Sequence, residues 1–213
     1  MNTSGLIAFD LDGTLIDSLE GIHSSLVHAC HQLQCEAPSI TTLKQRIGPP
    51  LHQYLPELLG LSGEQQQPML EALLQAFRSH HDSQGWRNFQ LYDGVITLLE
   101  QLHAMGYELH VVTQKPHPIA LDVLRQARLE GFLNSLHAPL PGVSFDKSSS
   151  LVQLRRQGDV RHWYVGDTAA DQQAATAARY NFVAATYGYG MTHDAAMQIS
   201  CPLELLQVLE GAA

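Results

Sequence analysis

Lysine is scarce in this chain of 213 residues, which contains only three, Lys44, Lys115 and Lys147. Lysine and arginine together number 12 against 21 aspartates and glutamates, so the formal net charge is −9 with histidine neutral. A surface that binds nucleic acid needs clustered basic side chains. The chain's only basic doublet is Arg155-Arg156, so we expect no nucleic acid as a partner.

Cysteine is equally rare, with Cys30, Cys35 and Cys201 in all. An odd number at these spacings fits neither a metal-ligand motif nor a secreted disulfide framework, so we expect three buried free thiols in a reducing compartment. No apolar run approaches the length of a membrane span, and the amino terminus lacks a basic segment ahead of its short apolar run. We therefore expect a soluble, unprocessed, cytoplasmic protein with no membrane partner.

The apolar content is sufficient for a full core, since 45% of the residues are hydrophobic. The length suits one large domain, or one domain with a smaller insertion. From residue 16 to residue 85 the apolar positions recur with helical spacing and no strand is predicted. The helices predicted in this block span about 19–30, 43–47, 51–59 and 70–81.

After residue 85 the pattern changes to helices alternating with strands. We predict strands at 107–112, 135–138, 162–165 and 182–185, and a last helix with Pro202 in its first turn. This alternation is typical of an α/β, Rossmann-like fold, with a mostly parallel sheet and helices on both faces. The predicted core is 1–15 with 86–213, and 16–85 is an inserted all-helical domain.

Two carboxylates, Asp10 and Asp12, come directly after the apolar run 6–9 and directly before Gly13-Thr14. On a strand, positions two apart point to the same side, about 6 to 7 Å from each other. This spacing allows one carboxylate to touch a divalent cation and attack an electrophile while the other transfers a proton. The alternative is an acidic turn at the strand end, because aspartate and glycine are ordinary turn residues.

Later strands end in polar residues as well, and ligands of open parallel sheets bind beyond these carboxyl ends. The residues in question are Thr113, Gln114 and Lys115 after the strand 107–112, Lys147 before the helix at Leu151, and Asp167 after the strand 162–165, with Asp171 four residues on. With the first two aspartates they form an acidic set that a hard cation would complete, and Mg²⁺ prefers carboxylate oxygens, waters and a substrate phosphate. Threonine and lysine supply donors for phosphoryl oxygens. The set predicts Mg²⁺-assisted phosphoryl transfer to a carboxylate.

Four segments, DLDGTLIDS, VVTQKP, FDKSS and VGDTAADQQAA, resemble in order the four motifs of the haloacid dehalogenase superfamily. The resemblance covers essentially the whole chain. It implies that Asp10 is the nucleophile that becomes phosphorylated, and that Asp12 protonates the leaving oxygen and then activates water. The acid at Asp12 favours a phosphatase or phosphomutase, because the dehalogenases and phosphonatases of the superfamily lack it.

The same resemblance implies that Thr113 and Lys147 hold the phosphoryl group. It also implies that Mg²⁺ is bound by the carboxylates of Asp10 and Asp167 and by the backbone carbonyl of Asp12. Asp171 would then be an outer ligand or would orient Lys147.

The helical insertion resembles the superfamily's small cap, which closes over the site and selects the leaving group. The segments 46–51 (RIGPPL) and 92–95 (YDGV) look like the phosphoglycolate phosphatase branch, which implies a small phosphorylated metabolite as substrate. Arg46 would bind a substrate carboxylate, although an arginine on a helix face is commonly solvated. Gln114 replaces the asparagine usual after the motif threonine, and His117 is a further candidate to face the cleft.

Other functions are compatible with the same motifs. A sugar phosphomutase or a pyrophosphatase would use the same chemistry, and a receiver-like or inactive phospho-binding module would use the same residue types without turnover. The sequence leaves open whether the protein is a monomer or a homodimer.

Overall fold

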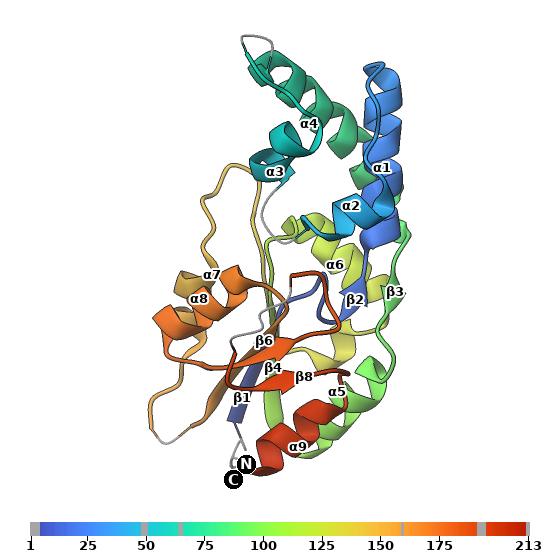
Figure 1. Cartoon of the computed structure of the whole chain (residues 1–213). Helices are drawn as coiled ribbons and strands as arrows, with labels where there is room; N and C mark the ends of the chain where they lie inside the picture. The colour runs from blue at the N-terminus through green and yellow to red at the C-terminus, as the bar shows by residue number, and fades with distance from the viewer. Residues whose placement is uncertain (1–4, 48–50, 64–65, 159, 191–194, 212–213) are drawn as a thin grey trace. The chain divides into compact units, whose positions relative to one another are not determined.

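The computed structural model describes residues 5–47, 51–63, 66–158, 160–190 and 195–211 (Figure 1). The chain divides into two compact units, one formed by residues 1–17 and 91–213 and the other by residues 18–90. No helix among the described ranges is both long and apolar enough to cross a membrane.

The first unit is built on a six-stranded sheet with the order β5-β4-β1-β6-β7-β8, in which every neighbouring pair is parallel. Its strands are β1 (Gly5–Phe9), β4 (Tyr107–Val112), β5 (Ser135–His137), β6 (His162–Gly166), β7 (Asn181–Ala185) and β8 (Gln198–Ile199). Its helices are α5 (Val95–Ala104), α6 (His117–Gln126), η2 (Glu130–Phe132), α7 (Lys147–Leu154), α8 (Ala169–Ala178) and α9 (Glu204–Gly211). The predicted α/β, Rossmann-like class is confirmed.

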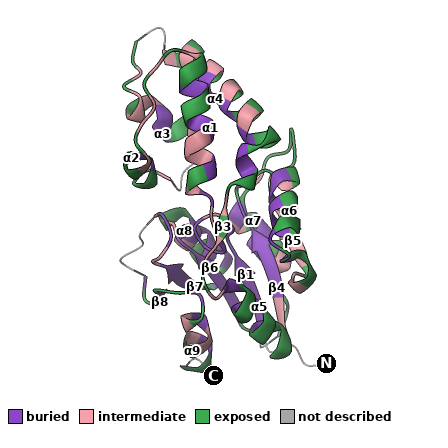
Figure 2. Cartoon of the chain, turned by 90° about the vertical axis from the view of Figure 1, so that its right-hand side faces the viewer, coloured by how far each residue is buried: buried purple, intermediate pink, exposed green. Residues whose placement is uncertain are grey.

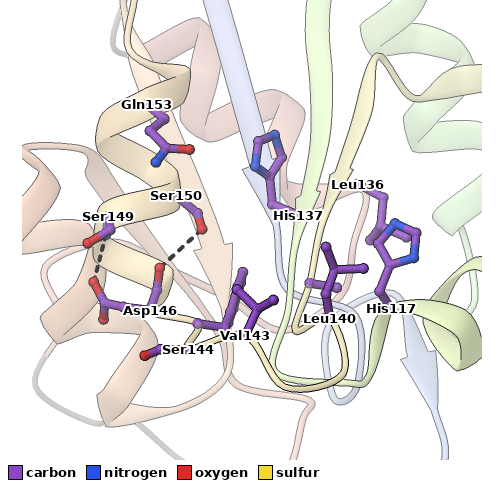
Figure 3. Close-up of a pocket in the computed structure, with 12 residues that line it drawn as sticks. His117, Leu136, His137, Leu140, Val143, Ser144, Asp146, Ser149, Ser150 and Gln153 are labelled. Atoms are coloured by element: carbon purple, nitrogen blue, oxygen red, sulfur yellow. Dashed lines mark hydrogen bonds between the residues drawn. The ribbon is translucent and has the colours of Figure 1, made fainter.

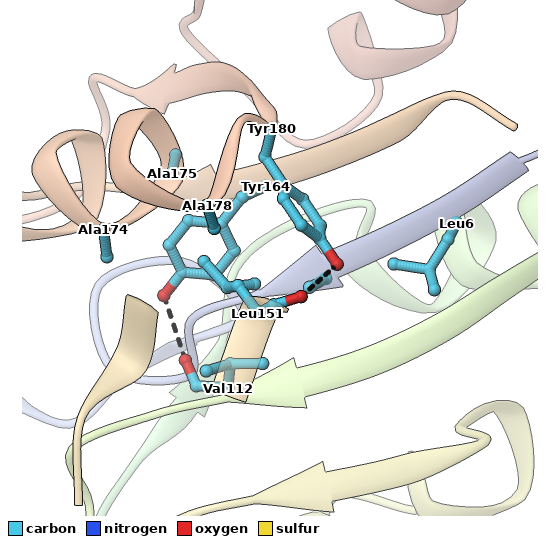
Figure 4. Packing of buried hydrophobic residues seen from close by; sticks show 9 residues of the cluster. Leu6, Val112, Leu151, Tyr164, Ala174, Ala175, Ala178 and Tyr180 are labelled. Atoms are coloured by element: carbon cyan, nitrogen blue, oxygen red, sulfur yellow. Dashed lines mark hydrogen bonds between the residues drawn. The ribbon is translucent and has the colours of Figure 1, made fainter. Parts of the chain in front are cut away.

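Helices pack on both faces of this sheet. One face presents alternate residues of its central strands to α7 and α8, and the cluster there consists of Leu6, Ala8, Val112, Leu151, Tyr164, Ala174, Ala175, Ala178 and Tyr180 (Figure 4). Because side chains alternate along a strand, Ile7 and Phe9 point to the opposite face, where α5 contacts β4. Burial on both faces explains why β1 is apolar throughout, and Figure 2 shows the central strands as buried.

The second unit consists of helices α1 (Leu19–Gln32), α2 (Ile40–Lys44), α3 (Leu51–Leu58), α4 (Gln66–Ser83) and η1 (Gly85–Arg87). It has its own apolar core, which includes Leu26, Leu43, Leu55, Leu73 and Phe77. Helix α1 packs along α4. The four predicted helices are therefore confirmed, with boundaries that shift by a few residues.

Three details differ from the prediction. Ile16 and Asp17 form a short strand, β2, rather than the start of the helical block, and β2 pairs with β3 (Gln90–Leu91) in a separate two-stranded sheet. Pro202 precedes α9 instead of lying in its first turn. The three cysteines are free but not all buried, since Cys30 is buried, Cys35 is half-buried and Cys201 is exposed.

Candidate active site

Three aspartates of the first unit converge at the carboxyl ends of two adjacent strands. Asp10 follows β1, Asp167 follows β6, and Asp171 lies in the first turn of α8. The backbone N–H of Asp10 donates to the carbonyl of Val165 at 2.9 Å, which fixes the ends of the two strands against each other. One carboxylate oxygen from each aspartate lies within 4.8 Å of the others, and all three residues are buried. The order of the strands thus assembles acids that are far apart in the sequence.

Lys147 supplies the positive charge of this cluster. It is the first residue of α7, whose N-cap is Asp146, with the carboxylate accepting from the backbone N–H of Ser149. The buried Lys147 ammonium lies 3.0 Å from Asp10 Oδ1 and donates to Asp171 Oδ1 at 2.6 Å. A lysine at a helix start is unusual for the helix dipole, and the two carboxylates account for its position.

Asp171 is the most completely bonded member of the cluster. Its Oδ1 accepts from Lys147 Nζ and, at 2.9 Å, from the hydroxyl of Tyr164, while its Oδ2 accepts from both the backbone N–H and the hydroxyl of Thr168. Thr168 and Asp171 form a capping box at the start of α8. Both oxygens of Asp171 are therefore in use, which favours the role of orienting Lys147 over direct metal binding.

Asp167 is held from one side only. Its Oδ2 accepts from the backbone N–H groups of Tyr189 at 2.7 Å and of Gly190 at 3.3 Å. A Cβ on Gly13 or on Gly188 would clash with this carboxylate, so both glycines are needed for the close approach of the two loops. The other oxygen, Oδ1, is buried and has no hydrogen-bond partner among the described residues.

The electrostatics of the cluster are unbalanced. Three carboxylates against one ammonium leave two negative charges in a buried site. Burial, followed by repulsion from Asp10 and Asp171, raises the pKa of Asp167 to about 8. Burial also raises the pKa of Asp10 to about 6, although Lys147 opposes it. Burial also tends to raise the pKa of Asp171, but the charge of Lys147 and the hydrogen bonds to the carboxylate outweigh burial and lower the pKa.

These residues fit a bound Mg²⁺. The surplus of two negative charges equals the charge of the ion, and the unpartnered Asp167 Oδ1 is an oxygen ligand of the kind that Mg²⁺ prefers. A cation would also offset the repulsion that adds to burial in raising the pKa values of Asp10 and Asp167. The set is all oxygen, which does not suit a soft transition metal.

Asp12 has a separate partner, Lys115. The Lys115 ammonium donates to Asp12 Oδ1 at 2.9 Å and to Oδ2 at 3.3 Å, and the lysine itself is buried. Thr113 is buried at the end of β4, and its hydroxyl accepts from the backbone N–H of Lys115 at 3.2 Å. The sequence placed Lys115 only among the polar residues that follow the strand 107–112, whereas the structure makes it the ionic partner of the predicted proton-transfer group.

The remaining predicted residues lie outside the carboxylate cluster or in the helical unit. Gln114 is exposed directly after Thr113. Arg46 belongs to the helical unit, where its guanidinium donates to both oxygens of the Glu57 carboxylate and both side chains are exposed. A role of Arg46 toward a substrate stays a prediction. Residues 48–50 of the RIGPPL segment lie outside the described residues.

His117 lines a cavity of about 360 Å³ beyond the end of β5 (Figure 3). The loop 138–146 and the first two turns of α7 form the other walls, with Leu140, Val143 and Ser150 among the lining side chains. None of the clustered aspartates lines it. The cavity is thus distinct from the carboxylate cluster, and His117 faces the cavity.

Sequence reasoning missed Tyr164, Thr168 and the loop around Tyr189. Thr168 and Asp171 carried a readable signal, since a threonine three residues before an acid at a helix start is a capping box. Tyr164 carried none, because an aromatic residue in an apolar strand is expected to pack in the core.

Comparison with known proteins agrees with this geometry. The chain is 34% identical over 195 residues to the tyrosine-protein kinase PtkA of Mycobacterium tuberculosis, and the match covers 87% of this chain but 63% of that protein. It is 30% identical over 193 residues to a phosphoglycolate phosphatase of Rhodobacter capsulatus, with coverage of 87% and 86%. A solved haloacid dehalogenase-like hydrolase from Streptococcus pneumoniae superposes with a TM-score of 0.85 at 27% identity, covering 98% of this chain and 99% of the other.

The chain spans less than two thirds of the length of PtkA. The family model described as haloacid dehalogenase-like hydrolase matches residues 7–185, a range that contains the whole carboxylate cluster. The resemblance of the four motifs is thereby confirmed, and the chain belongs to the haloacid dehalogenase-like hydrolases.

Proposed function

We propose that this protein is a Mg²⁺-dependent phosphatase that hydrolyses a small phosphate monoester through a phosphorylated Asp10. The observation that carries the proposal is the buried cluster of Asp10, Asp167 and Asp171, in which Asp10 and Asp171 share one ammonium, Lys147, and two negative charges remain in surplus. Such a site favours a divalent cation together with the phosphoryl group that the cation and lysine bind. Family membership supports hydrolase chemistry.

The proposed steps use the chain's own side chains. Asp10 attacks phosphorus in line with the leaving oxygen, and Asp12 gives that oxygen a proton. Asp12 then accepts a proton from the water that hydrolyses the acyl phosphate. Lys147 and Thr113 stabilise the equatorial oxygens, and Asp171 holds Lys147 in place. Mg²⁺, held by Asp10, Asp167 and the backbone carbonyl of Asp12, would supply Lewis-acid stabilisation of the phosphoryl charge.

The pairing of Asp12 with Lys115 supports the proton-transfer role. The ion pair orients the Asp12 carboxylate, whose side chain is 22% exposed and so remains accessible to a leaving group and to water. A general acid must lie within hydrogen-bond reach of the atom that it protonates. In this proposal Lys115 positions the Asp12 carboxylate and does not bind the phosphate.

The proposed substrate is a small, phosphoglycolate-like metabolite, by analogy with the Rhodobacter relative. The helical unit 18–90 is proposed as the cap that selects the leaving group. No further partner is needed for this chemistry. Cytoplasmic location, and a monomeric or homodimeric state, belong to the same proposal.

The test is release of inorganic phosphate from p-nitrophenyl phosphate, followed by a panel of phosphate esters ranked by kcat/KM. Activity should require Mg²⁺ and should be abolished by EDTA and by Asp10→Asn. Turnover that survives both changes contradicts the mechanism. If phosphoglycolate ranks no higher than generic esters, the substrate assignment fails while the chemistry stands. Transfer of the phosphoryl group to a sugar hydroxyl would identify a phosphomutase, and turnover of pyrophosphate alone a pyrophosphatase.

The similarity to PtkA makes ATP-dependent tyrosine phosphorylation a second candidate. The discriminating assay incubates the protein with γ-labelled ATP and Mg²⁺ and then measures alkali-stable phosphotyrosine. Stable phosphotyrosine without phosphate release from monoesters would replace the phosphatase proposal. A phosphoenzyme that persists without either activity would indicate a phospho-binding module.

A further inference from the structure

Cys30 and Cys35 are brought together at the end of α1 by the geometry of the helix terminus. The backbone N–H of Cys35 donates to the carbonyl of Cys30 at 3.0 Å, and the N–H of Gln34 donates to the carbonyl of His31 at 3.3 Å. Gln34 has a left-handed backbone with φ of 55°. These features define a Schellman motif, in which the first and last residues of the turn bring their side chains into contact.

In this motif the contacting side chains are the two cysteines. The Cys35 thiol lies close enough to contribute to the raised pKa of the Cys30 thiol, although burial raises it more. Both side chains belong to the apolar core of the helical unit, with Cys30 fully buried and Cys35 half-buried. Cys201 is exposed and belongs to the other unit.

We infer that Cys30 and Cys35 form a reversible disulfide, a redox modification site within the helical unit. The backbone bond that closes the turn fixes the separation of the two residues before oxidation. Bond formation then requires the two sulfurs to approach to about 2 Å, the length of a disulfide. The inference is independent of the proposed phosphatase activity.

The two sulfurs have different roles because their exposure differs. Burial, with a smaller contribution from Cys35, raises the pKa of the Cys30 thiol to about 12, so this thiol is a poor first nucleophile. Cys35 reaches solvent and reacts first with a peroxide. Its sulfur bonds to one peroxide oxygen as the O–O bond breaks, which gives a sulfenic acid and water.

Cys30 is the resolving residue. Its sulfur attacks the sulfenic sulfur of Cys35, the S–S bond forms as the S–O bond breaks, and the thiol proton leaves with the hydroxyl as a second water. The sum is two thiols and one hydrogen peroxide giving one disulfide and two waters. A dithiol reductant reverses the reaction by thiol–disulfide exchange.

The alternative is that the two cysteines are only small apolar side chains that fill the contact position of the motif. The sequence allows a direct test, because no lysine or arginine precedes Lys44 and none lies between Cys30 and Cys35. Trypsin therefore releases both cysteines in one peptide, residues 1–44, whereas Cys201 lies in the peptide 180–213.

The experiment treats the intact, folded protein with a small excess of hydrogen peroxide, blocks remaining thiols under denaturing conditions and measures the tryptic peptides by mass. We expect the number of alkylatable thiols to fall from three to one. Peptide 1–44 should remain unalkylated and should be about 2 Da lighter than the same peptide with two free thiols, because two hydrogens are lost. Dithiothreitol should restore all three. In the matched control Cys201→Ser the two remaining thiols should both be lost.

The outcome that overturns the inference is equally specific. If peptide 1–44 keeps both thiols, gains oxygen atoms, or becomes linked to Cys201 or to a second chain, Cys30 and Cys35 do not form the proposed site. Cys35→Ser provides the complementary check, because peroxide should then leave Cys30 alkylatable. Loss of the Cys30 thiol in that variant also contradicts the assigned order of reaction.

Discussion

Replacing Tyr164 by phenylalanine removes one hydroxyl from the interior of the protein and nothing else. Tyr164 is fully buried, and its hydroxyl lies 3.0 Å from the carbonyl of Val112 (Figure 4). The same hydroxyl lies 2.9 Å from Asp171 Oδ1. Burial and the nearby aspartates raise the pKa of this hydroxyl, so it acts as a donor. It joins the end of β4, next to Thr113, to the carboxylate that holds Lys147.

The magnitude follows from these contacts. A hydrogen bond to a charged group contributes about 1.5 to 3 kcal/mol, and a buried acceptor left without a donor costs a similar amount. We therefore expect Tyr164→Phe to lower the free energy of unfolding by about 2 kcal/mol. Asp171 would then attract Lys147 more strongly and draw it away from Asp10, so kcat should fall about tenfold, equivalent to about 1.4 kcal/mol of barrier.

Tyr180 offers a matched control. Its hydroxyl is also buried in the same apolar cluster, but it donates at 2.8 Å to the backbone carbonyl of Leu151 rather than to a carboxylate of the site. Tyr180→Phe should lower the free energy of unfolding by about 1 kcal/mol and leave kcat unchanged.

The assays are urea unfolding and steady-state hydrolysis of p-nitrophenyl phosphate for the wild type and both variants. A role in positioning Lys147 predicts a fall in kcat for Tyr164→Phe alone, with little change in KM. If both variants lose stability and neither loses kcat, Tyr164 is only a core residue and the reasoning is refuted.

Three further predictions follow from single contacts. Gly13→Ala places a Cβ against Asp167 and forces the new alanine to keep the left-handed backbone of position 13, φ +83°. As a result, kcat/KM should fall about a hundredfold. Near-normal kinetics would show that the loops can separate freely. Lys115→Met deprives Asp12 of its ionic partner and should lower kcat for p-nitrophenyl phosphate about tenfold. An unchanged kcat would exclude a role of Lys115 in orienting Asp12. Burial lowers the pKa of His110 from 6.5 to about 4, so the unfolded chain binds the proton first as pH falls. The free energy of unfolding should therefore drop by about 2 kcal/mol between about pH 7 and pH 5, as measured by urea unfolding at both pH values. His110→Gln should remove that pH dependence, and an equal drop in the variant would assign the dependence to other groups.

The prediction from sequence was accurate where local pattern determines structure. β4 has the predicted boundaries, because its apolar residues alternate with Glu108 and His110 between a glycine and a polar turn, and this pattern has few alternatives. It was inaccurate at short segments such as β2, whose two residues form a strand only by pairing with β3. Two residues are too few for a periodic signal.

The same distinction applies to the site. The sequence alone indicated Asp10 and Asp167, because polar residues that follow apolar strands of a parallel sheet lie along one edge, and it indicated Lys147 through its motif before the helix at Leu151. It could not identify the hydroxyl of Tyr164, because its hydrogen bond to Asp171 depends on the packing of α8 against β6. The sequence already indicated a surplus of acids, and the structure added that Lys115 pairs with Asp12, which leaves the surplus with Asp10, Asp167 and Asp171 around Lys147.

The sequence by itself therefore determined the family, the α/β core with its inserted helices, and the identity of the acids and the lysine, since these follow from residue types in a fixed order along the chain. The tertiary structure decided the partners: Lys115 with Asp12, Tyr164 with Asp171, and the backbone N–H of Cys35 with the carbonyl of Cys30. The physical reason is that a hydrogen bond or ion pair depends on distances of a few ångströms. The fold sets those distances, whereas sequence patterns specify only which residues share an edge or a face.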